Sequence, residues 1–308
     1  MIDTKTAIEK ITNGEFDNLF TDIYIDSSMI DYQKKRYVHA IEQYETIFCP
    51  DKVAIFSAPG RSEVCGNHTD HQHGMVLATS INLDTIAVSA KNNNDVVRFV
   101  SDGYDMITLN INDLEVNDDE AGTTVSLIRG VLRGLKDHGY KIGGFNAYAT
   151  SDVLVGAGLS SSAAFEVLVG TVINGLFANG EVDATEIAKF GKFAENIYYN
   201  KPSGLMDQMA SSVGSMVFID FKSTEKPVVE KLEFDLKKHG HALCIIDSGA
   251  DHADLTDEYA SIPAEMKEIA SYFGKKYLRE IDRNEFYDNI HNIRSVSYTH
   301  LRAHETVL

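Results

Sequence analysis

The sequence has little of several features that would suggest a location outside the cytoplasm. Its three cysteines are widely spaced and match no metal-ligand pattern, which favours a reducing compartment over a disulfide framework. We expect each cysteine to be a small buried side chain. No apolar run approaches the roughly 18 residues needed to span a bilayer, and the first residues show no secretory pattern. The sequence therefore predicts a cytoplasmic protein without a membrane anchor.

Positive charge is also scarce. Lysine and arginine number 28 against 46 acidic residues, so the formal net charge is −18. Nucleic acids and anionic membranes both require a basic face, and we expect neither as a partner. A nucleotide stays possible because it needs only a local positive potential. With five prolines, no repeat and no Gly/Ser-rich linker, any domain boundary should be compact.

Hydrophobic periodicity predicts a mixture of strands and helices. Helices are expected over 34–48, 124–139, 161–177 and 184–200. Strands are expected over 53–61, 75–90, 96–100, 145–151, 215–221 and 241–247. Such a mixture indicates an α/β or α+β fold.

The stretch GAGLSSSAA stands where the helix over 161–177 should begin. Gly156 and Gly158 permit backbone angles closed to other residues and let successive N–H groups converge on an anion. The helix start adds unpaired N–H groups, and the serines at 160–162 can bind phosphate, lend an oxygen to Mg²⁺ or cap the helix. The stretch lacks a Walker A lysine and the dinucleotide fingerprint. A glycine-rich turn before a serine-capped helix explains it equally well by itself.

Two further stretches concentrate polar side chains at turns. Residues 58–74, APGRSEVCGNHTDHQHG, contain one arginine, two carboxylates and three histidines. Residues 200–212, NKPSGLMDQMASS, place Asp207 and Gln208 behind a Pro-Ser-Gly turn. The histidines could suggest zinc, but we do not expect it because no nearby cysteine or carboxylate spacing completes a tetrahedral set.

Together these three stretches resemble the motifs of one family. GAGLSSSAA resembles the phosphate-binding motif of the GHMP small-molecule kinases, and residues 58–74 resemble the galactokinase signature GRxNLIGEHTDY. KPSGLMDQ is similar to the family's catalytic segment. The resemblance covers residues 50–294 and implies a two-domain α+β fold with the active site in the interdomain cleft. It implies a GHMP kinase domain with a helical extension over 1–212 and a partial second domain over 213–294.

The resemblance also implies roles for individual residues. Asp207 would orient or deprotonate the sugar hydroxyl, and Arg61 would lie beside it. The residues implied for sugar binding are Asn67, His68, Asp70, Gly204 and Tyr259. The residues implied for ATP binding are Gly156, Gly158, Leu159, Ser160, Ser161, Ser162 and Ala163. Ser162 and Glu195 are the implied Mg²⁺ ligands.

The activity that the resemblance implies is ATP-dependent phosphorylation of galactose to galactose 1-phosphate by a cytoplasmic monomer. Asn67 and His71 stand where the family signature has Glu and Tyr, so another hexose or a hexosamine remains open. A galactokinase-like sugar sensor and a kinase for mevalonate or homoserine also remain open. The intact Ser-Ser-Ala-Ala segment, Arg61 and Asp207 favour an enzyme, and HTDHQHG favours a galactokinase. Taken singly, Arg61 or Glu195 could be an ordinary surface charge.

The carboxyl end carries two expectations of its own. Family members have a third, glycine-rich motif near that end, whereas only Gly249 and Gly274 follow Gly240 here. The ending SVSYTHLRAHETVL resembles the translation of a transposase-type sequencing adapter. We therefore expect the genuine sequence of this piece to stop at about Arg294, residues 295–308 to be non-native, and the piece to show little kinase activity.

Overall fold

The computed structural model describes residues 1–49, 52–66, 68–154, 156–246 and 256–293, with the backbone alone for 256–260. Its helices are α1 (Thr4–Thr12), α2 (Asp17–Tyr24), α3 (Ile30–Phe48), α4 (Thr124–Asp137), α5 (Ser161–Phe177), α6 (Ala184–Phe193), α7 (Met206–Val213), α8 (Thr256–Tyr272) and α9 (Arg283–Ile293). Its strands are β1 (Ile2–Asp3), β2 (Lys52–Cys65), β3 (Met75–Lys91), β4 (Val96–Ser101), β5 (Ile107–Asn110), β6 (Phe145–Ser151), β7 (Met216–Asp220) and β8 (Val228–Leu232). Short 3₁₀ or π-helical turns are η1 (Ser27–Met29), η2 (Thr69–Gln72), η3 (Asp118–Glu120), η4 (Ala194–Tyr198), η5 (Lys237–His239) and η7 (Leu278–Glu280).

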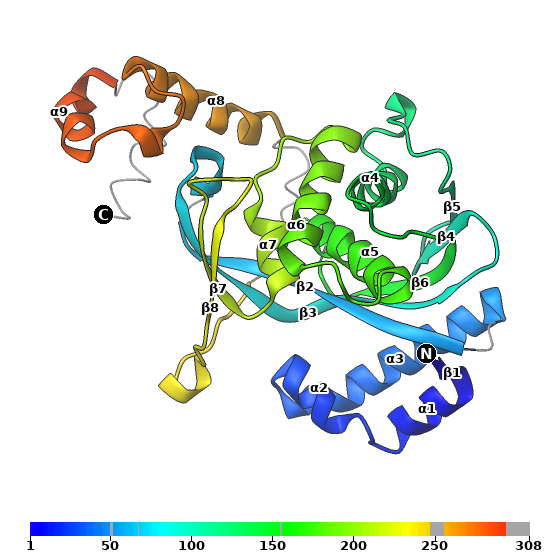
Figure 1. Ribbon diagram of the computed structural model, residues 1–308. Coiled ribbons are helices and arrows are strands. Elements are labelled where there is room, and N and C mark those ends of the chain that lie inside the picture. Colours follow the sequence, from blue (N-terminus) through cyan, green and yellow to red (C-terminus); the bar gives the residue numbers. More distant parts are fainter. Residues whose placement is uncertain (50–51, 67, 155, 247–255, 294–308) are drawn as a thin grey trace.

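An eight-stranded sheet forms the middle layer of the molecule (Figure 1). Its order is β1-β2-β3-β6-β4-β5, and β7 and β8 are added beside β3. The first half of β3 pairs with β7 and the second half with β6, so one long strand joins two parts of the sheet. The β4–β6 pairing is parallel, and the other pairings described are antiparallel. This mixed sheet with helices on both faces confirms the expected α+β class.

The pairing of β2 with β3 shifts register between Pro59 and Arg61. One residue of β2, Gly60, here faces residues 81–83 of β3, so the extra residues lie in β3. Just past this shift, Arg61 N donates to the Leu159 carbonyl at 3.1 Å. The backbone of β2 at Arg61 is therefore bonded to the GAGLSSSAA stretch, residues 156–164.

Helices α4 to α7 cover one face of the sheet (Figure 1). The core between them contains Phe99 and Phe145 from the strands, Leu132 from α4 and Leu168 from α5, all fully buried. Helix α5 is apolar around most of its circumference because the sheet, α4 and α6 enclose it. The helices expected over 124–139 and 161–177 are confirmed, whereas the one expected over 184–200 changes at Ala194 into a π-helical turn.

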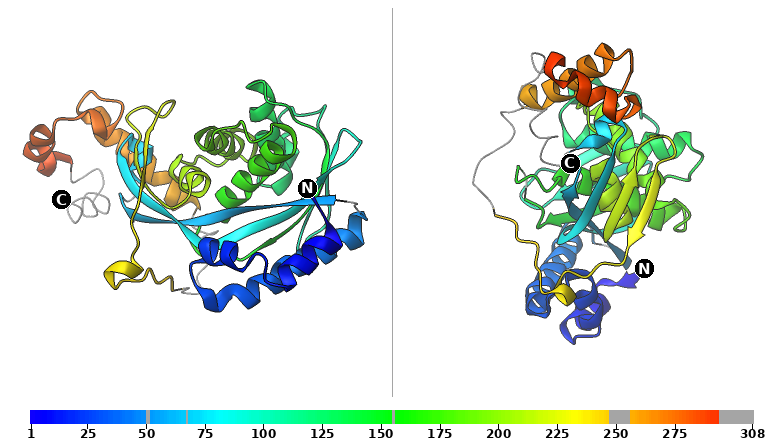
Figure 2. Two further views of the ribbon diagram at one scale, coloured as in Figure 1. Left: turned by 60° about the horizontal axis from the view of Figure 1, so that its bottom comes forward. Right: turned by 90° about the vertical axis from the view of Figure 1, so that its left-hand side faces the viewer.

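Helices α1 to α3 cover the opposite face (Figure 2). Tyr37, Ile41 and Tyr44 of α3 lie on one buried stripe, as the periodicity of residues 34–48 predicts. Arg36 on the same helix reaches the sheet and pairs with the buried Asp84 at 2.6 Å. The N-terminal segment is therefore an integral layer of the fold.

Two expectations from the sequence are wrong. We expected a strand over 241–247. Residues 241–246 are exposed and form no strand, and residue 247 lies outside the described residues. The outer edge of β8 has no pairing strand among the described residues, and residues 241–246 do not pair with it. The three cysteines are exposed free thiols instead of buried side chains, because each lies at the end of an element or in an extended segment.

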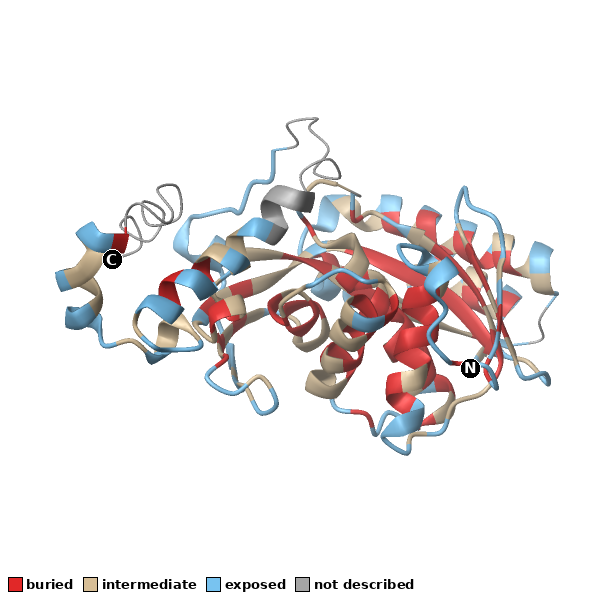
Figure 3. Ribbon diagram, turned by 90° about the horizontal axis from the view of Figure 1, so that it is seen from above, coloured by how far each residue is buried: buried red, intermediate tan, exposed pale blue. Residues whose placement is uncertain are grey.

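The segment from α8 to α9 lies beyond the end of the β2–β3 hairpin, and most of its described surface is exposed or half-buried (Figure 3). It is attached to the sheet domain by Arg279, which pairs with Asp220 at 2.9 Å. The boundary expected at residue 212 lies just before β7, although β7 and β8 belong to the sheet of β3, so the division into domains stays a prediction. Among the described residues, no helix is both long enough and apolar enough to cross a membrane.

Candidate active site

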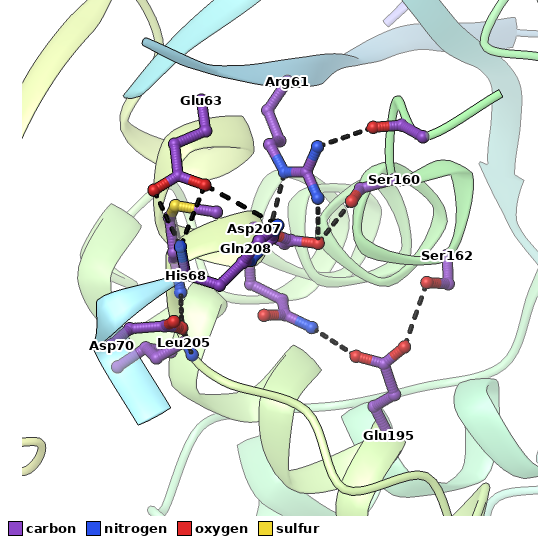
Figure 4. Close-up of polar contacts among 12 residues, drawn as sticks. Arg61, Glu63, His68, Asp70, Ser160, Ser162, Glu195, Leu205, Asp207 and Gln208 are labelled. Atoms are coloured by element: carbon purple, nitrogen blue, oxygen red, sulfur yellow. Dashed lines mark hydrogen bonds and ion pairs between the residues drawn. The ribbon is translucent and has the colours of Figure 1, made fainter. Parts of the chain in front are cut away.

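An ion pair between Arg61 and Asp207 joins two motifs that lie 146 residues apart (Figure 4). Arg61 Nε donates to Asp207 Oδ1 at 2.7 Å, and a terminal nitrogen of Arg61 donates to Oδ2 at 2.6 Å. The other terminal nitrogen donates to the Gly158 carbonyl at 2.7 Å. The arginine is thereby held at once to Asp207 of the stretch 200–212 and to Gly158 of GAGLSSSAA, residues 156–164, which we call the phosphate loop after its family resemblance.

The two partners differ in exposure. The Arg61 side chain is 9% exposed, whereas that of Asp207 is 29% exposed and can meet a ligand. Burial alone would raise the pKa of Asp207, but the Arg61 guanidinium and hydrogen bonds from Arg61 and Ser160 lower that pKa below its usual value. Burial correspondingly opposes the charge on Arg61, yet Asp207 raises the pKa of Arg61. Asp207 is therefore an accessible, ionised carboxylate at neutral pH.

The phosphate-loop segment adopts the backbone that its glycines permit. Gly156 and Gly158 have φ values of 77° and 71°, and Ser160 is left-handed at 56°. Ser160 is the N-cap residue of α5, but its hydroxyl donates to Asp207 and does not cap the helix. The first N–H groups of a helix have no intrahelical acceptor, so they remain available to an anion here.

Leu159 and Ala163 support this loop from inside. Leu159 is 4% exposed and packs with Val153 and Ala164, while its carbonyl receives the Arg61 N–H. Ala163 is 1% exposed. Their side chains are part of the core, so a nucleotide could contact these two residues through the backbone only. Ser161 is half-buried on the first turn of α5.

Ser162 and Glu195, the two Mg²⁺ ligands implied by the resemblance, are in direct contact. Ser162 Oγ donates to Glu195 Oε1 at 3.0 Å, and Lys201 Nζ lies 2.7 Å from the same oxygen. Burial opposes the charge on Lys201, but Glu195 raises the pKa of that amine. Glu195 is 2% exposed, so its interpretation as an ordinary surface glutamate is wrong.

Behind this pair lies a second buried carboxyl that the sequence analysis missed. Gln208 Nε2 donates to Glu195 Oε2 at 2.8 Å and to Glu166 Oε2 at 3.0 Å. Burial, and then the charge of Glu195, raises the pKa of Glu166 well above its usual value. A signal exists in the sequence: Glu166 follows Ser162 by four residues, which places both on one side of α5. Lys201, beside the catalytic motif, was missed as well.

Asp70 is positioned against the loop that carries Asp207. Its Oδ2 accepts from the backbone N–H groups of Leu205 and Met206 at 2.9 and 3.1 Å. A Cβ at Gly204 would lie 1.7 Å from the same oxygen, so this close approach requires glycine. Asp70 is 5% exposed, and its Oδ1 has no partner among the described residues. An unpaired buried carboxylate oxygen is a ready acceptor for a ligand hydroxyl.

The rest of the predicted sugar site is only partly described. His68 is exposed with a left-handed φ of 54°, and its N–H donates to the Glu63 carboxylate at 3.0 and 3.1 Å. The family signature has an asparagine at the position of Glu63, so a carboxylate contact at this place is specific to this sequence. Asn67 lies outside the described residues, and Tyr259 is described by its backbone alone. Within the described ranges, no group of three or more His, Cys, Asp or Glu side chains could hold a metal.

Comparisons with known proteins agree with the motifs. Residues 126–215 match the GHMP kinases N terminal domain, and residues 42–91 match the galactokinase galactose-binding signature. A galactokinase of Streptomyces coelicolor is 29% identical over 245 residues, covering 78% of this chain and 62% of the relative. A galactokinase of Limosilactobacillus reuteri is 29% identical over 260 residues, covering 80% and 65%. The chain thus spans less than two thirds of either relative.

Solved structures show the same relationship. Lactococcus lactis galactokinase complexed with galactose matches with a TM-score of 0.67 at 25% identity, covering 80% of this chain and 65% of that one. Methanococcus jannaschii mevalonate kinase shares the fold at a TM-score of 0.52 and 18% identity, covering 72% of each chain.

Proposed function

We propose that this chain, which belongs to the galactokinase family of the GHMP kinases, binds ATP and a sugar and transfers the terminal phosphoryl group to the sugar's anomeric hydroxyl. The acceptor suggested by the family is galactose, and the product would be galactose 1-phosphate. The observation that carries the proposal is the Arg61–Asp207 ion pair, with contacts of 2.6 and 2.7 Å, directly beside the phosphate loop.

The pair suits the demands of phosphoryl transfer. The transition state is loose and spreads charge over the phosphoryl oxygens, so catalysis depends on positioning and electrostatics. Asp207 would accept a hydrogen bond from the sugar hydroxyl, orient its oxygen toward the phosphorus and receive the proton as the new bond forms. Arg61 would keep Asp207 ionised and stabilise the charge of the moving group.

The phosphate side would be formed by backbone groups and two oxygen ligands. The N–H groups at the start of α5 would bind ATP phosphates, with Ser160 and Ser161 at the edge of the loop. Ser162 Oγ and Glu195 Oε1, 3.0 Å apart, form a donor set that fits a hard cation. These residues would hold Mg²⁺, which neutralises phosphate charge when bound. Lys201 contacts the same carboxylate and could instead pair with a phosphate oxygen.

The sugar side would centre on Asp70. Its unpaired Oδ1 would accept a sugar hydroxyl, while Gly204 lets the Asp70 carboxylate lie directly against the loop. The family motifs place three further residues at the sugar, namely His68, Asn67 and Tyr259. The amide of Asn67 can donate as well as accept, so it would contact a hydroxyl differently from the usual glutamate.

The test is a coupled ADP-release assay of the complete protein with a panel of free sugars, in parallel with thermal unfolding in the presence of each sugar. Galactose should raise the unfolding temperature and support ADP release above the ATP-only rate. Glucose and mannose serve as epimeric controls. If no sugar stabilises the chain or increases ADP release, the proposed function is wrong.

A further inference from the structure

A pocket of about 440 Å³ adjoins Asp70 and Gly204. Its walls come from η2, from α6 and the loop before α7, and from the α8–η7 segment. We call it the lysine pocket and define it by Asp70, His71, His73, Lys192, Lys267 and Tyr277. A pocket of this size suits a small ligand.

The charge of the lysine pocket is opposite to that of the chain. Lys192 and Lys267 line it together with two histidines, and Asp70 is the one carboxylate among its lining residues. One oxygen of Asp70 is already engaged by two backbone N–H groups. The whole chain carries a formal charge of −18, so a basic pocket is a local feature that the average composition does not explain.

Lys192 is the distinctive member of this set. It is half-buried on the last turn of α6, and the described residues provide no hydrogen bond or ion pair to its Nζ. Burial lowers the pKa of Lys192, and the charge of Asp70 opposes that effect only in part. Three other basic side chains around the site are paired, Arg61 with Asp207, Lys201 with Glu195 and Arg279 with Asp220. Lys267 is exposed, so water can solvate its charge. A half-buried ammonium without a partner is costly, so an anion would relieve it.

The opposite wall is attached to the domain by specific contacts. The His73 ring stacks on Tyr277 with a centroid distance of 3.7 Å. Leu278 N donates to Gln72 Oε1 at 3.0 Å, and Arg279 donates to the His73 carbonyl at 3.3 Å. These contacts hold the η7 turn against η2, so the pocket is a constituent of the fold.

We propose that the lysine pocket receives an anionic substituent of the sugar, so that the preferred acceptor is a monosaccharide carrying a carboxylate or a phosphate group, with Lys192 as the specificity-determining residue. The inference rests on the proposed kinase function and narrows its substrate class. It follows from the position of the pocket beside Asp70 and from the unpaired ammonium that faces it. The sugar ring would contact Asp70, and the anionic group would pair with Lys192.

The test compares galactose, galacturonate and galactose 6-phosphate by calorimetric titration and by ADP release. We expect one of the two anionic sugars to bind at least about tenfold more tightly than galactose, as a desolvated charge pair permits. Which of them binds distinguishes a carboxylate from a phosphate substituent. This preference should weaken as salt is raised, while the affinity for galactose should change little. The salt series needs no variant, so it does not depend on the folding of a mutant.

Lys192→Met should abolish the preference and leave the affinity for galactose near that of the wild type, whereas Lys192→Arg should retain part of it. The matched control is Lys189→Met on the same helix, because Lys189 Nζ contacts the Glu225 carbonyl at 2.6 Å and is not part of the pocket. Equal affinity for galactose and both anionic sugars, or a preference that persists in Lys192→Met, overturns this inference alone. If no sugar binds at all, the proposed function and this inference both fail.

Discussion

Two arginine–aspartate pairs on opposite faces of the same sheet show what distinguishes a functional ion pair from a structural one. Arg36 and Arg61 are each 7% exposed, and each lies 2.6 Å from its partner carboxylate. The Asp84 side chain is only 3% exposed, whereas that of Asp207 is 29% exposed. Accessibility of the carboxylate, and not the pairing itself, separates them.

The surroundings differ in the same way. Asp84 also accepts from Tyr24 and Ser57, and Arg36 donates to two backbone carbonyls, so every neighbour of that pair is supplied by the fold. Asp207 accepts instead from the Ser160 hydroxyl, and Arg61 donates to the Gly158 carbonyl of the glycine-rich loop. A sealed pair stabilises a structure, while an open one beside a glycine-rich loop can bind and react.

The largest expected effect comes from the open pair. Asp207→Asn keeps the shape but not the charge, and we expect kcat for ADP release to fall by roughly 10²–10⁴ with a much smaller change in sugar affinity. Steady-state kinetics and titration with the sugar measure the two quantities. Asp183→Asn is the control, because Asp183 is an N-cap carboxylate remote from the site. Near-normal activity of Asp207→Asn would remove this residue from the reaction.

The sealed pair should respond in stability. Arg36→Met leaves Asp84 buried without its cation, and we expect the free energy of unfolding to drop by about 3–5 kcal/mol. Urea unfolding measures the loss. The control is Arg133→Met, which removes ion pairs with the exposed carboxylates of Asp137 and Glu115 and should cost less than about 1 kcal/mol. Equal losses in the two variants would contradict the comparison.

A substitution in the phosphate loop should remove the stabilisation of the protein by ATP. Ser161→Phe places a large ring at the start of α5, and we expect it to abolish the stabilisation of the fold by ATP, which reaches about 2.7 kcal/mol at a hundredfold excess over Kd. Thermal unfolding with and without ATP is the measurement. Ser212→Ala, on α7 and bonded to the Ala184 carbonyl, is the matched serine control. If ATP stabilises Ser161→Phe as much as the wild type, the loop does not bind ATP and serves only as the start of α5.

The smallest effect concerns Glu166, whose raised pKa favours the protonated carboxyl in the folded state. The unfolded chain loses this proton above about pH 4.5, so the free energy of unfolding should decrease as pH rises from there toward the folded-state pKa. The amide of Glu166→Gln does not titrate, so the stability of the variant lacks this pH dependence. As pH rises, the free energy of unfolding of the wild type should therefore fall relative to that of the variant, by at most about 1.4 kcal/mol per pH unit.

Urea unfolding of both proteins between pH 5 and pH 8 checks this difference. The exposed Glu181→Gln should run parallel to the wild type, since its carboxyl lies in solvent. If Glu166→Gln also runs parallel, the buried carboxyl is already ionised in the fold and the assignment of its protonation is wrong.

The sequence by itself determined the features that depend on neighbouring residues. Helix α5 begins at Ser161 because glycines and serines precede a long apolar stretch, and α3 and α4 follow their 3.6-residue periodicity. The resemblance of three short stretches to the motifs of one family named Asp207, Arg61, Asp70 and Glu195 as candidates. Turn residues, caps and periodicity act within a few positions, so one stretch carries its own information.

Only the tertiary structure decided what lies across the sheet. The contact of Arg61 with Asp207 spans 146 residues, the burial of Glu195 requires Gln208 and Glu166, and the lysine pocket closes when Tyr277 stacks on His73. The strand expected over 241–247 is wrong because an apolar stretch becomes a strand only where it pairs with a sheet, and residues 241–246 form no such pairing. Pairing partners, solvent exposure and pKa values depend on distant segments, and no local pattern in the chain encodes them.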